Sequence, residues 1–266
     1  MKKAASFALG CKVNQYESEA IAELFAEKGY EIVGIDEEAD VYVINTCTVT
    51  NFGDKKSRQL IRKVKRQNEN AIVAVVGCYA QTAPKELMEI AGVNLVIGTK
   101  DRAQIVEMVE QYDRANGVEN HVSDIMKERV FEPLSIQKLA NRTRAYLKIQ
   151  DGCSQYCSYC IIPYARGPIR SREPQEVVAE VKRLAENGFK EVVLTGIHVA
   201  SYGKDRRDTS LLDILKQVHE VEGIERIRFS SIEPNVVTEE FAQTMAALPK
   251  VCDHFHLSLQ SGCDKP

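Results

Sequence analysis

Six of the eight cysteines in the sequence are spaced in ways that could support metal chemistry. Cys153, Cys157 and Cys160 form a C-x3-C-x2-C loop. Three thiolates this close can hold one side of a metal cluster, whereas a closed zinc site and most electron-transfer clusters take four protein ligands. No fourth cysteine or histidine is close in sequence, so one metal atom would stay open for chemistry. The alternative is a structural zinc site with a distant fourth ligand.

Three other cysteines have no close partner, but they share a position. Cys11, Cys47 and Cys78 each lie two or three residues after the last apolar residue of a strand-like run. Because parallel strands end at one edge of a sheet, we expect the three thiols to meet there as ligands of a second cluster. The alternative is three unrelated buried cysteines, since free cysteine often packs as a small hydrophobic residue. Cys252 and Cys263 fit neither pattern, and we take neither as a ligand.

Strand and helix patterns alternate through residues 1–112, which we predict to form an α/β domain. Apolar runs at 5–10, 40–45, 71–77 and 94–98 are each followed by a helical pattern. This alternation predicts a parallel sheet flanked by helices, and near-continuous apolar runs suit strands buried on both faces. Residues 113–141 show no firm period and are interpreted as a connection with room for one short strand.

The alternation resumes in residues 142–266, the second predicted domain. Strands are expected at 144–150, 191–196, 226–231 and 254–260, with helices at 173–188, 209–221 and 238–248. A partial (β/α) barrel and an open α/β sheet fit this pattern equally well. A complete barrel takes roughly 250 residues, so we expect an incomplete domain in a fragment of a longer protein. His254 and His256 share one face of the last strand and are expected to pack inside the barrel.

The composition is that of a soluble globular protein. The 266 residues are 44% hydrophobic, with a net charge of -3, so any contact with nucleic acid must come from a local basic patch. No apolar run approaches the roughly 20 residues of a membrane helix. The start "MKKAASFALGC" imitates a lipoprotein signal, but its apolar core is shorter than the roughly 7–15 residues required. We therefore expect a cytoplasmic protein, in which clustered cysteines hold metal more often than disulfides.

These motifs resemble a known family. The C-x3-C-x2-C loop, with Tyr159 before its last cysteine and after the first strand of a (β/α) domain, resembles the radical S-adenosylmethionine (SAM) signature. With the three isolated cysteines added, the chain is similar to the radical SAM methylthiotransferases along nearly its whole length. "GCKVN" differs from the "GCQMN" and "GCPKN" of the isopentenyladenosine and ribosomal-protein branches. Together with "INTCTVTNFGDKKSRQLIR" and "LTGIHVASYG", it most resembles the branch that modifies N6-threonylcarbamoyladenosine at position 37 of tRNA.

The resemblance implies two [4Fe-4S] clusters and SAM. A cluster on Cys11, Cys47 and Cys78 would carry the sulfur, which one SAM methylates. A second SAM, at the cluster of the C-x3-C-x2-C loop, would give the radical that takes hydrogen from C2 of the adenine before the methylthio group is delivered there. The implied partners are tRNA and a flavodoxin- or ferredoxin-like electron donor. No catalytic residue beyond the cluster ligands is assigned.

Three alternatives to this function stay open. The acceptor could be isopentenyladenosine tRNA or a ribosomal protein. The chain could be a different radical SAM enzyme, in which the N-terminal cluster does no more than relay electrons. The chain could also be a non-catalytic zinc or iron–sulfur protein that binds RNA.

Four residues are candidates for contacts with SAM. Tyr159 belongs to the signature, and Gly196 ends the strand in "LTGIH", where relatives contact the SAM amino group through the backbone. Ser231 and Glu233 follow the third strand of the domain, where side chains often reach the ribose. The alternative is that these are ordinary turns at strand ends.

A basic helix at 52–68 is the candidate RNA-binding surface. Arg58, Arg62 and Arg66 fall on one face at i, i+4 spacing. Because the helix follows Cys47, a phosphate contact near the active site is expected, with a solvated surface helix as the alternative. Three arginines after the cluster loop could meet RNA or the SAM carboxylate, or pair with glutamates: Arg166, Arg170 and Arg172.

Overall fold

The computed structural model describes residues 1–48, 51–136 and 144–263, which form two compact units. Unit 1 comprises Met1–Ile136 with Ser154–Pro168, and unit 2 comprises Gln137–Cys153 with Ile169–Pro266. The expected boundary at 141 lies outside the described residues. Among the residues that the structure describes, no helix combines the length and apolar character needed to cross a membrane.

Unit 1 contains a six-stranded sheet in the order β2-β1-β3-β4-β5-β6. Every pair of neighbouring strands is parallel, as predicted. The strands are β1 Lys3–Ala8, β2 Glu31–Ile32, β3 Val41–Thr46, β4 Ile72–Gly77, β5 Leu95–Ile97 and β6 Glu119–Asn120. The edge strand β6 lies in the predicted connection, so this part of the connection extends the sheet.

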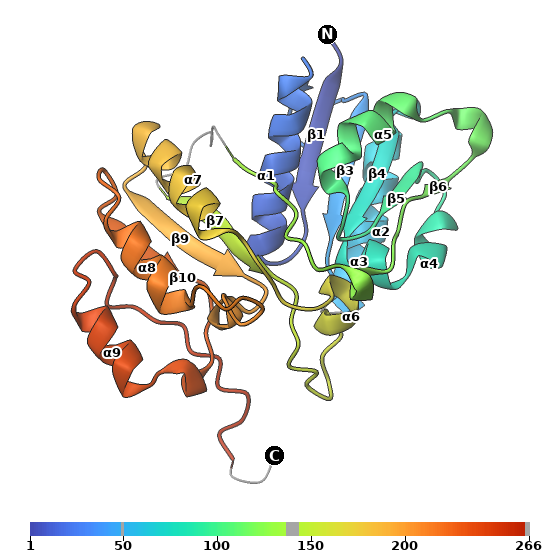
Figure 1. Cartoon of the computed structure of the whole chain (residues 1–266). Helices are drawn as coiled ribbons and strands as arrows, with labels where there is room; N and C mark the ends of the chain where they lie inside the picture. Colours follow the sequence, from blue (N-terminus) through green and yellow to red (C-terminus); the bar gives the residue numbers. More distant parts are fainter. Residues whose placement is uncertain (49–50, 137–143, 264–266) are drawn as a thin grey trace. The chain divides into compact units, whose positions relative to one another are not determined.

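Helices cover both faces of this sheet (Figure 1). They are α1 Lys12–Glu27, α2 Asn51–Gln67, α3 Cys78–Thr82, α4 Pro84–Met88 and α5 Ile105–Gln111. The short helix α6, Ile162–Arg166, also belongs to unit 1. Three 3₁₀ turns complete the unit: η1 Arg102–Gln104, η2 Arg114–Asn116 and η3 Ile125–Lys127.

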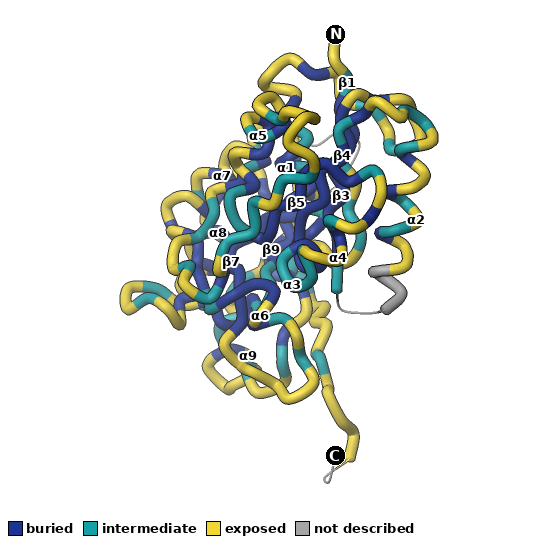
Figure 2. Tube along the Cα trace, turned by 90° about the vertical axis from the view of Figure 1, so that its right-hand side faces the viewer, coloured by how far each residue is buried: buried dark blue, intermediate teal, exposed yellow. Residues whose placement is uncertain are grey.

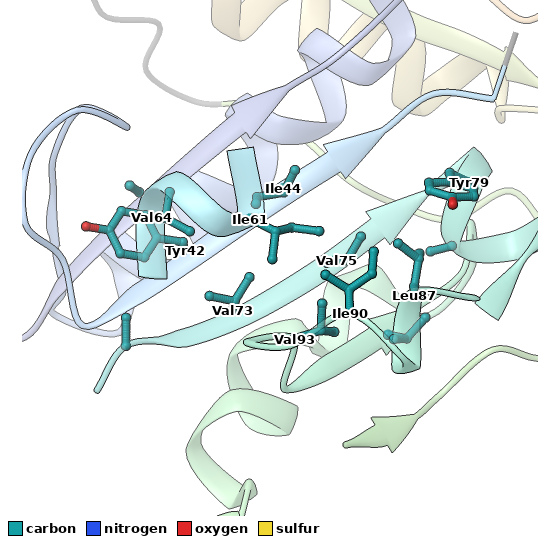
Figure 3. Close-up of a cluster of buried hydrophobic side chains, with 14 of the residues drawn as sticks. Tyr42, Ile44, Ile61, Val64, Val73, Val75, Tyr79, Leu87, Ile90 and Val93 are labelled. Atoms are coloured by element: carbon teal, nitrogen blue, oxygen red, sulfur yellow. The ribbon is translucent and has the colours of Figure 1, made fainter. Parts of the chain in front are cut away.

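Each face of the sheet has its own hydrophobic core. On one face, Tyr42 and Ile44 of β3 belong to a cluster with Ile61 and Val64 of α2 (Figure 3). On the other, the alternate residues of β3 cluster with side chains of α1 and α5. Strands with helices on both faces need apolar residues at every position, which confirms the interpretation of the near-continuous runs. Figure 2 shows β3 and β5 buried along their length, and β4 is buried after its first residue, Ile72.

Unit 2 contains a four-stranded sheet in the order β10-β9-β7-β8. Its strands are β7 Ala145–Asp151, β8 Arg170–Ser171, β9 Glu191–Gly196 and β10 Arg226–Phe229. Its helices are α7 Pro174–Glu186, α8 Leu211–His219 and α9 Glu239–Ala246, with 3₁₀ turns η4 Val199–Ser201 and η5 Pro234–Val236. The predicted parallel strands correspond to β7, β9 and β10, and the antiparallel β8 was not predicted.

The predicted strand at 254–260 is wrong. Only an isolated bridge between Ile232 and Leu257 remains in this segment. The backbone N–H of His254 donates to the carbonyl of Cys252 at 2.7 Å, so it is used in a local turn and not in a ladder. His254 and His256 are exposed, against the expectation that they pack in an interior.

Glu128 should make the stability of unit 1 sensitive to acid. Its carboxylate accepts a hydrogen bond from Lys100, which lowers its pKa from 4.5 to about 2. A depressed carboxyl pKa adds stability above pH 4.5 that is lost as the pH falls toward 2. We expect Glu128→Gln to lower the free energy of unfolding by about 1 kcal/mol at pH 7, a modest value because Lys100 is partly exposed. At pH 2 the substitution should change the free energy of unfolding very little.

Urea unfolding followed by far-ultraviolet circular dichroism at both pH values would measure this difference. Glu110→Gln, at an exposed position, is the control. A loss for Glu128→Gln that is the same at both pH values would contradict the prediction.

Candidate metal centre

Cys11, Cys47 and Cys78 follow three neighbouring strands of unit 1. The register pairs Ala8 with Asn45, and Thr46 with Gly77, so β1, β3 and β4 end side by side. Cys47 comes directly after β3, Cys78 directly after β4, and Cys11 after a two-residue turn. The structure therefore brings the three strand-end cysteines to the carboxyl edge of one sheet.

Two glycines allow close approach at this edge. Gly10 has φ +115°, and a Cβ built on it would lie 2.7 Å from the Cβ and 2.9 Å from the Sγ of Cys47. Gly77 has φ +95°, and a Cβ there would lie 2.3 Å from Oδ1 of Asn45. Both backbone conformations favour glycine, and both sites lack room for a side chain. The side chain of Cys47 thus packs directly against the turn that carries Cys11.

Asn14 connects these strand ends, although the sequence analysis did not single it out. Its Oδ1 accepts from Cys11 Sγ at 3.2 Å. Its Nδ2 lies 3.2 Å from the carbonyl oxygen of Leu9 and 2.9 Å from that of Thr46, the residue before Cys47. Asn14 is fully buried, so these polar contacts replace those that water would make.

Arg166 of α6 supplies a buried positive charge beside Cys78. Its Nε lies 3.1 Å from Cys78 Sγ, and its Nη2 donates to Asn14 Oδ1 at 3.0 Å. Its Nη1 pairs with Glu17 Oε1 at 2.5 Å. Glu17 pairs in turn with Arg102 Nη1 at 2.6 Å, and Arg102 also pairs with Glu132. The sequence analysis predicted that Arg166 either meets RNA or the SAM carboxylate, or pairs with a glutamate. The structure shows the pairing with a glutamate.

The donor chemistry of this edge suits an iron–sulfur cluster. Cys11 is exposed, Cys47 partly buried and Cys78 buried. Burial raises the pKa of the Cys78 thiol, and the Arg166 guanidinium opposes that rise. Soft thiolates are the usual ligands of such clusters, and a nearby cation offsets their charge. In the described part of the chain, no three histidine, cysteine or acidic side chains are grouped closely enough to hold a metal ion.

The cysteines of the C-x3-C-x2-C loop are divided between the units. Cys153 follows β7 in unit 2, while Cys157 and Cys160 belong to a segment of unit 1. The N–H of Cys160 donates to the carbonyl of Cys157 at 2.9 Å, which forms a tight turn. Tyr159 is 71% exposed. The assignment of these three residues as ligands rests on their spacing and stays a prediction.

The other SAM candidates lie at strand ends of unit 2. Gly196 ends β9, where a Cβ would come within 2.7 Å of Gln150 Oε1. Glu233 Oε1 lies 3.2 Å from Nε2 of His198, and Ser231 Oγ lies 2.7 Å from Nδ1 of His256. His198 was not predicted. The structure places Gly196 and Glu233 beside such polar partners, and the assignment to SAM stays a prediction.

The basic residues of unit 1 do not share one environment. Arg58 donates to the hydroxyl of Tyr79 at 2.7 Å and pairs with Glu86 at 3.0 Å. Arg62 and Arg66 are exposed, and neither pairs with an acidic side chain within the part of the chain that the structure describes. They line a hollow of about 660 Å³ together with Phe7 and Leu9. Lys56, Gln59, Leu60 and Lys63 complete its lining.

The two other arginines that follow the cluster loop pair with acidic groups inside unit 2. Arg170 Nη2 lies 3.7 Å from Asp151 Oδ2. Arg172 Nη1 lies 2.5 Å from Glu180 Oε2. Arg172 therefore shows the pairing with a glutamate that the alternative predicted, whereas Arg170 pairs with an aspartate.

Family models match both parts of the chain. Residues 3–98 match the uncharacterized protein family UPF0004, and residues 147–265 match the radical SAM superfamily. The chain belongs to the radical SAM proteins that carry a UPF0004 domain ahead of the radical SAM domain. This family implies a [4Fe-4S] cluster and SAM.

Curated relatives give a more particular likeness. The chain is 50% identical to the threonylcarbamoyladenosine tRNA methylthiotransferase MtaB of Bacillus subtilis, with 98% of the chain aligned to 58% of that protein. It is 41% identical to MtaB of Aquifex aeolicus, with 99% aligned to 64%. It is also 35% identical to the tRNA-2-methylthio-N(6)-dimethylallyladenosine synthase of Dictyoglomus thermophilum, with 96% aligned to 59%. The resemblance to the methylthiotransferase family is thereby confirmed, and the chain spans about three fifths of the length of these relatives.

A solved structure supports the fold. The radical SAM methyltransferase TsrM from Kitasatospora setae matches with a TM-score of 0.61 at 17% identity, over 93% of this chain and 58% of TsrM. That structure contains tryptophan and a SAM analogue, and a second TsrM structure contains cobalamin and a [4Fe-4S] cluster. At this identity the likeness concerns the fold alone.

Proposed function

We propose that the protein adds a methylthio group to C2 of the adenine in N6-threonylcarbamoyladenosine at position 37 of tRNA. The observation that carries this proposal is the alignment of Cys11, Cys47 and Cys78 behind three neighbouring parallel strands, in a chain that also holds a C-x3-C-x2-C loop. Relatives named for this nucleoside, at 50% and 41% identity, support the choice of substrate.

Each cysteine set would hold one [4Fe-4S] cluster. When bound, the clusters and SAM would supply the sulfur, the methyl group and one-electron chemistry. The chain's own part is to hold six thiolates, to bind SAM near Gly196 and Glu233, and to receive the nucleotide. The electron donor would be a flavodoxin- or ferredoxin-like protein of the cytoplasm.

A dimethylallyladenosine substrate is the second candidate, because a relative named for that activity is 35% identical. Mass spectrometry of tRNA nucleosides, from cells with and without the gene, separates the two. We expect 2-methylthio-N6-threonylcarbamoyladenosine to disappear in the mutant and to return with the wild-type gene. Loss of the dimethylallyl product alone would move the assignment to the other substrate, and no change in either would overturn both.

We further propose that the hollow beside α2 contacts RNA. Exposed Arg62 and Arg66 can meet phosphates, and Phe7, which is 36% exposed, offers a ring to a base. Arg58 is expected to contribute less, because Tyr79 and Glu86 already engage its guanidinium.

Arg62→Ala combined with Arg66→Ala should therefore weaken tRNA binding and flatten its dependence on salt. Since each phosphate contact adds about 0.9 to the slope of log K against log salt, we expect a decrease of up to about 2. Fluorescence anisotropy with the full-length protein and labelled tRNA over a range of salt would measure it. Lys28→Ala with Lys85→Ala removes two exposed charges elsewhere in unit 1 and serves as the control. Equal slopes for both double variants would contradict a role of the hollow.

A further inference from the structure

The buried polar residues at the carboxyl edge of unit 1 form one connected network around the three strand-end thiols. Asn14 accepts a hydrogen bond from the Cys11 thiol and donates one to the carbonyl of Thr46, the residue before Cys47. Arg166 contacts Cys78 directly and shares the Asn14 oxygen. Two side chains thus connect all three strand ends that carry cysteine.

The side chains of Asn14 and Arg166 are completely buried, so the loss of one of their contacts would lower the stability of the folded protein. A buried guanidinium needs a partner for its charge and acceptors for its N–H donors. Arg166 pairs with Glu17 through Nη1 and Nη2, donates from Nη2 to Asn14, and contacts Cys78 through Nε. Arg166 can pair with Glu17 without bringing its Nε close to a thiol. The contact between Nε and Cys78 is therefore a separate feature of the site.

Arg102 provides a natural comparison for Arg166. It is just as buried and pairs with the same Glu17, but it also pairs with Glu132. A purely structural charge network would make the two arginines equivalent, whereas a role at the thiols would separate them.

We propose that Asn14 and Arg166 are positioning residues that orient Cys11, Cys47 and Cys78 when these thiols bind a cluster, and that Arg166 raises the reduction potential of that cluster. The inference rests on the proposed ligand role of these cysteines. Hydrogen bonds and positive charge at ligand sulfurs stabilise the more negative, reduced state, so removing them lowers the potential. A charge held in a dry site acts strongly because little water screens it.

The test uses full-length protein in which Cys153, Cys157 and Cys160 are replaced by alanine, so that only the N-terminal cluster remains. Its midpoint potential is measured by a redox titration followed by electron paramagnetic resonance. We expect Arg166→Gln to lower the potential, Arg166→Lys to recover part of the loss, and Arg102→Gln to leave it near the parent value. Equal shifts in Arg166→Gln and Arg102→Gln, or no shift in either, would overturn the role of Arg166.

Asn14 is tested by the loss of iron to a chelator. Asn14→Asp keeps the size of the side chain but removes the amide that donates to the carbonyls of Leu9 and Thr46, and it should release iron at least about 10-fold faster. Asn94→Asp is the matched control, since Asn94 is also buried but bonds to Tyr112 and Val73. Equal release from both variants would overturn the role of Asn14.

Electron paramagnetic resonance also shows whether a variant binds a cluster at all. If Arg166→Gln retains no cluster while Arg102→Gln retains one, the positioning role is supported. If both variants are empty, a cluster signal in Arg166→Lys supports the role, and an empty Arg166→Lys variant overturns it. A parent protein without a four-iron signal would instead refute the proposed ligand set, and this outcome is distinct from failure of the inference.

Discussion

Replacement of Cys47 by alanine is expected to reduce 2-methylthio-N6-threonylcarbamoyladenosine in tRNA by at least about 100-fold. Cys47 directly follows β3 and packs against the Gly10 turn, and the register of β3 with β1 places it beside the strand end that leads to Cys11. A cluster with three protein ligands loses a third of its anchors when one is removed. The same loss is expected for the other five predicted ligands, which are Cys11, Cys78, Cys153, Cys157 and Cys160.

This prediction is measured by complementing a strain that lacks the gene with each full-length variant and analysing its tRNA nucleosides. Cys252→Ala and Cys263→Ala are the controls, because neither follows the strand-end pattern or the loop spacing. Immunoblots of each variant separate loss of function from loss of protein. A Cys47→Ala protein that is present and restores the modified nucleoside would contradict the ligand assignment.

The second large effect concerns Glu17, which pairs with two buried arginines. Its Oε1 lies 2.5 Å from Arg166 and its Oε2 lies 2.6 Å from Arg102, and all three side chains are fully buried. Glu17→Gln would leave two buried guanidinium groups with too little negative charge. Breaking such a network costs about 3–5 kcal/mol, a large share of the roughly 5–15 kcal/mol that stabilises a domain.

Urea unfolding of the full-length protein, followed by circular dichroism, measures this loss. Glu86→Gln is the matched control, since Glu86 also pairs with an arginine but is 59% exposed. Exposed ion pairs contribute about 0–1 kcal/mol, so the control should lose little. Similar losses in the two variants would contradict the view that burial makes the Glu17 network important.

The positions of the cysteines could be predicted because they depend on the chain's local pattern. Apolar runs located β1, β3 and β4, and parallel strands necessarily end at one edge. The partners around the cysteines could not be predicted in this way. Asn14 and Glu17 are ordinary polar residues of an amphipathic helix, and Arg166 is about 150 positions away in the sequence. Only the fold shows that they are buried together.

Local patterns also failed where tertiary contacts decide the outcome. Arg58, Arg62 and Arg66 are equivalent by helical spacing, yet Arg58 meets Glu86 from a different helix. The segment at 254–260 alternates like a strand, but Phe255 stacks on Phe229 at 6.4 Å between ring centroids, and the backbone turns locally. The short antiparallel β8 has two residues, too few for a periodic signal.

The proposal that one protein carries two iron–sulfur clusters on two separate sets of three cysteines is tested most directly by counting iron and acid-labile sulfide in the anaerobically reconstituted, full-length protein. We predict about eight irons per chain, falling to about four when Cys11, Cys47 and Cys78 are all replaced by alanine. Stoichiometric zinc without iron, or an iron content that this triple replacement leaves unchanged, would contradict the claim.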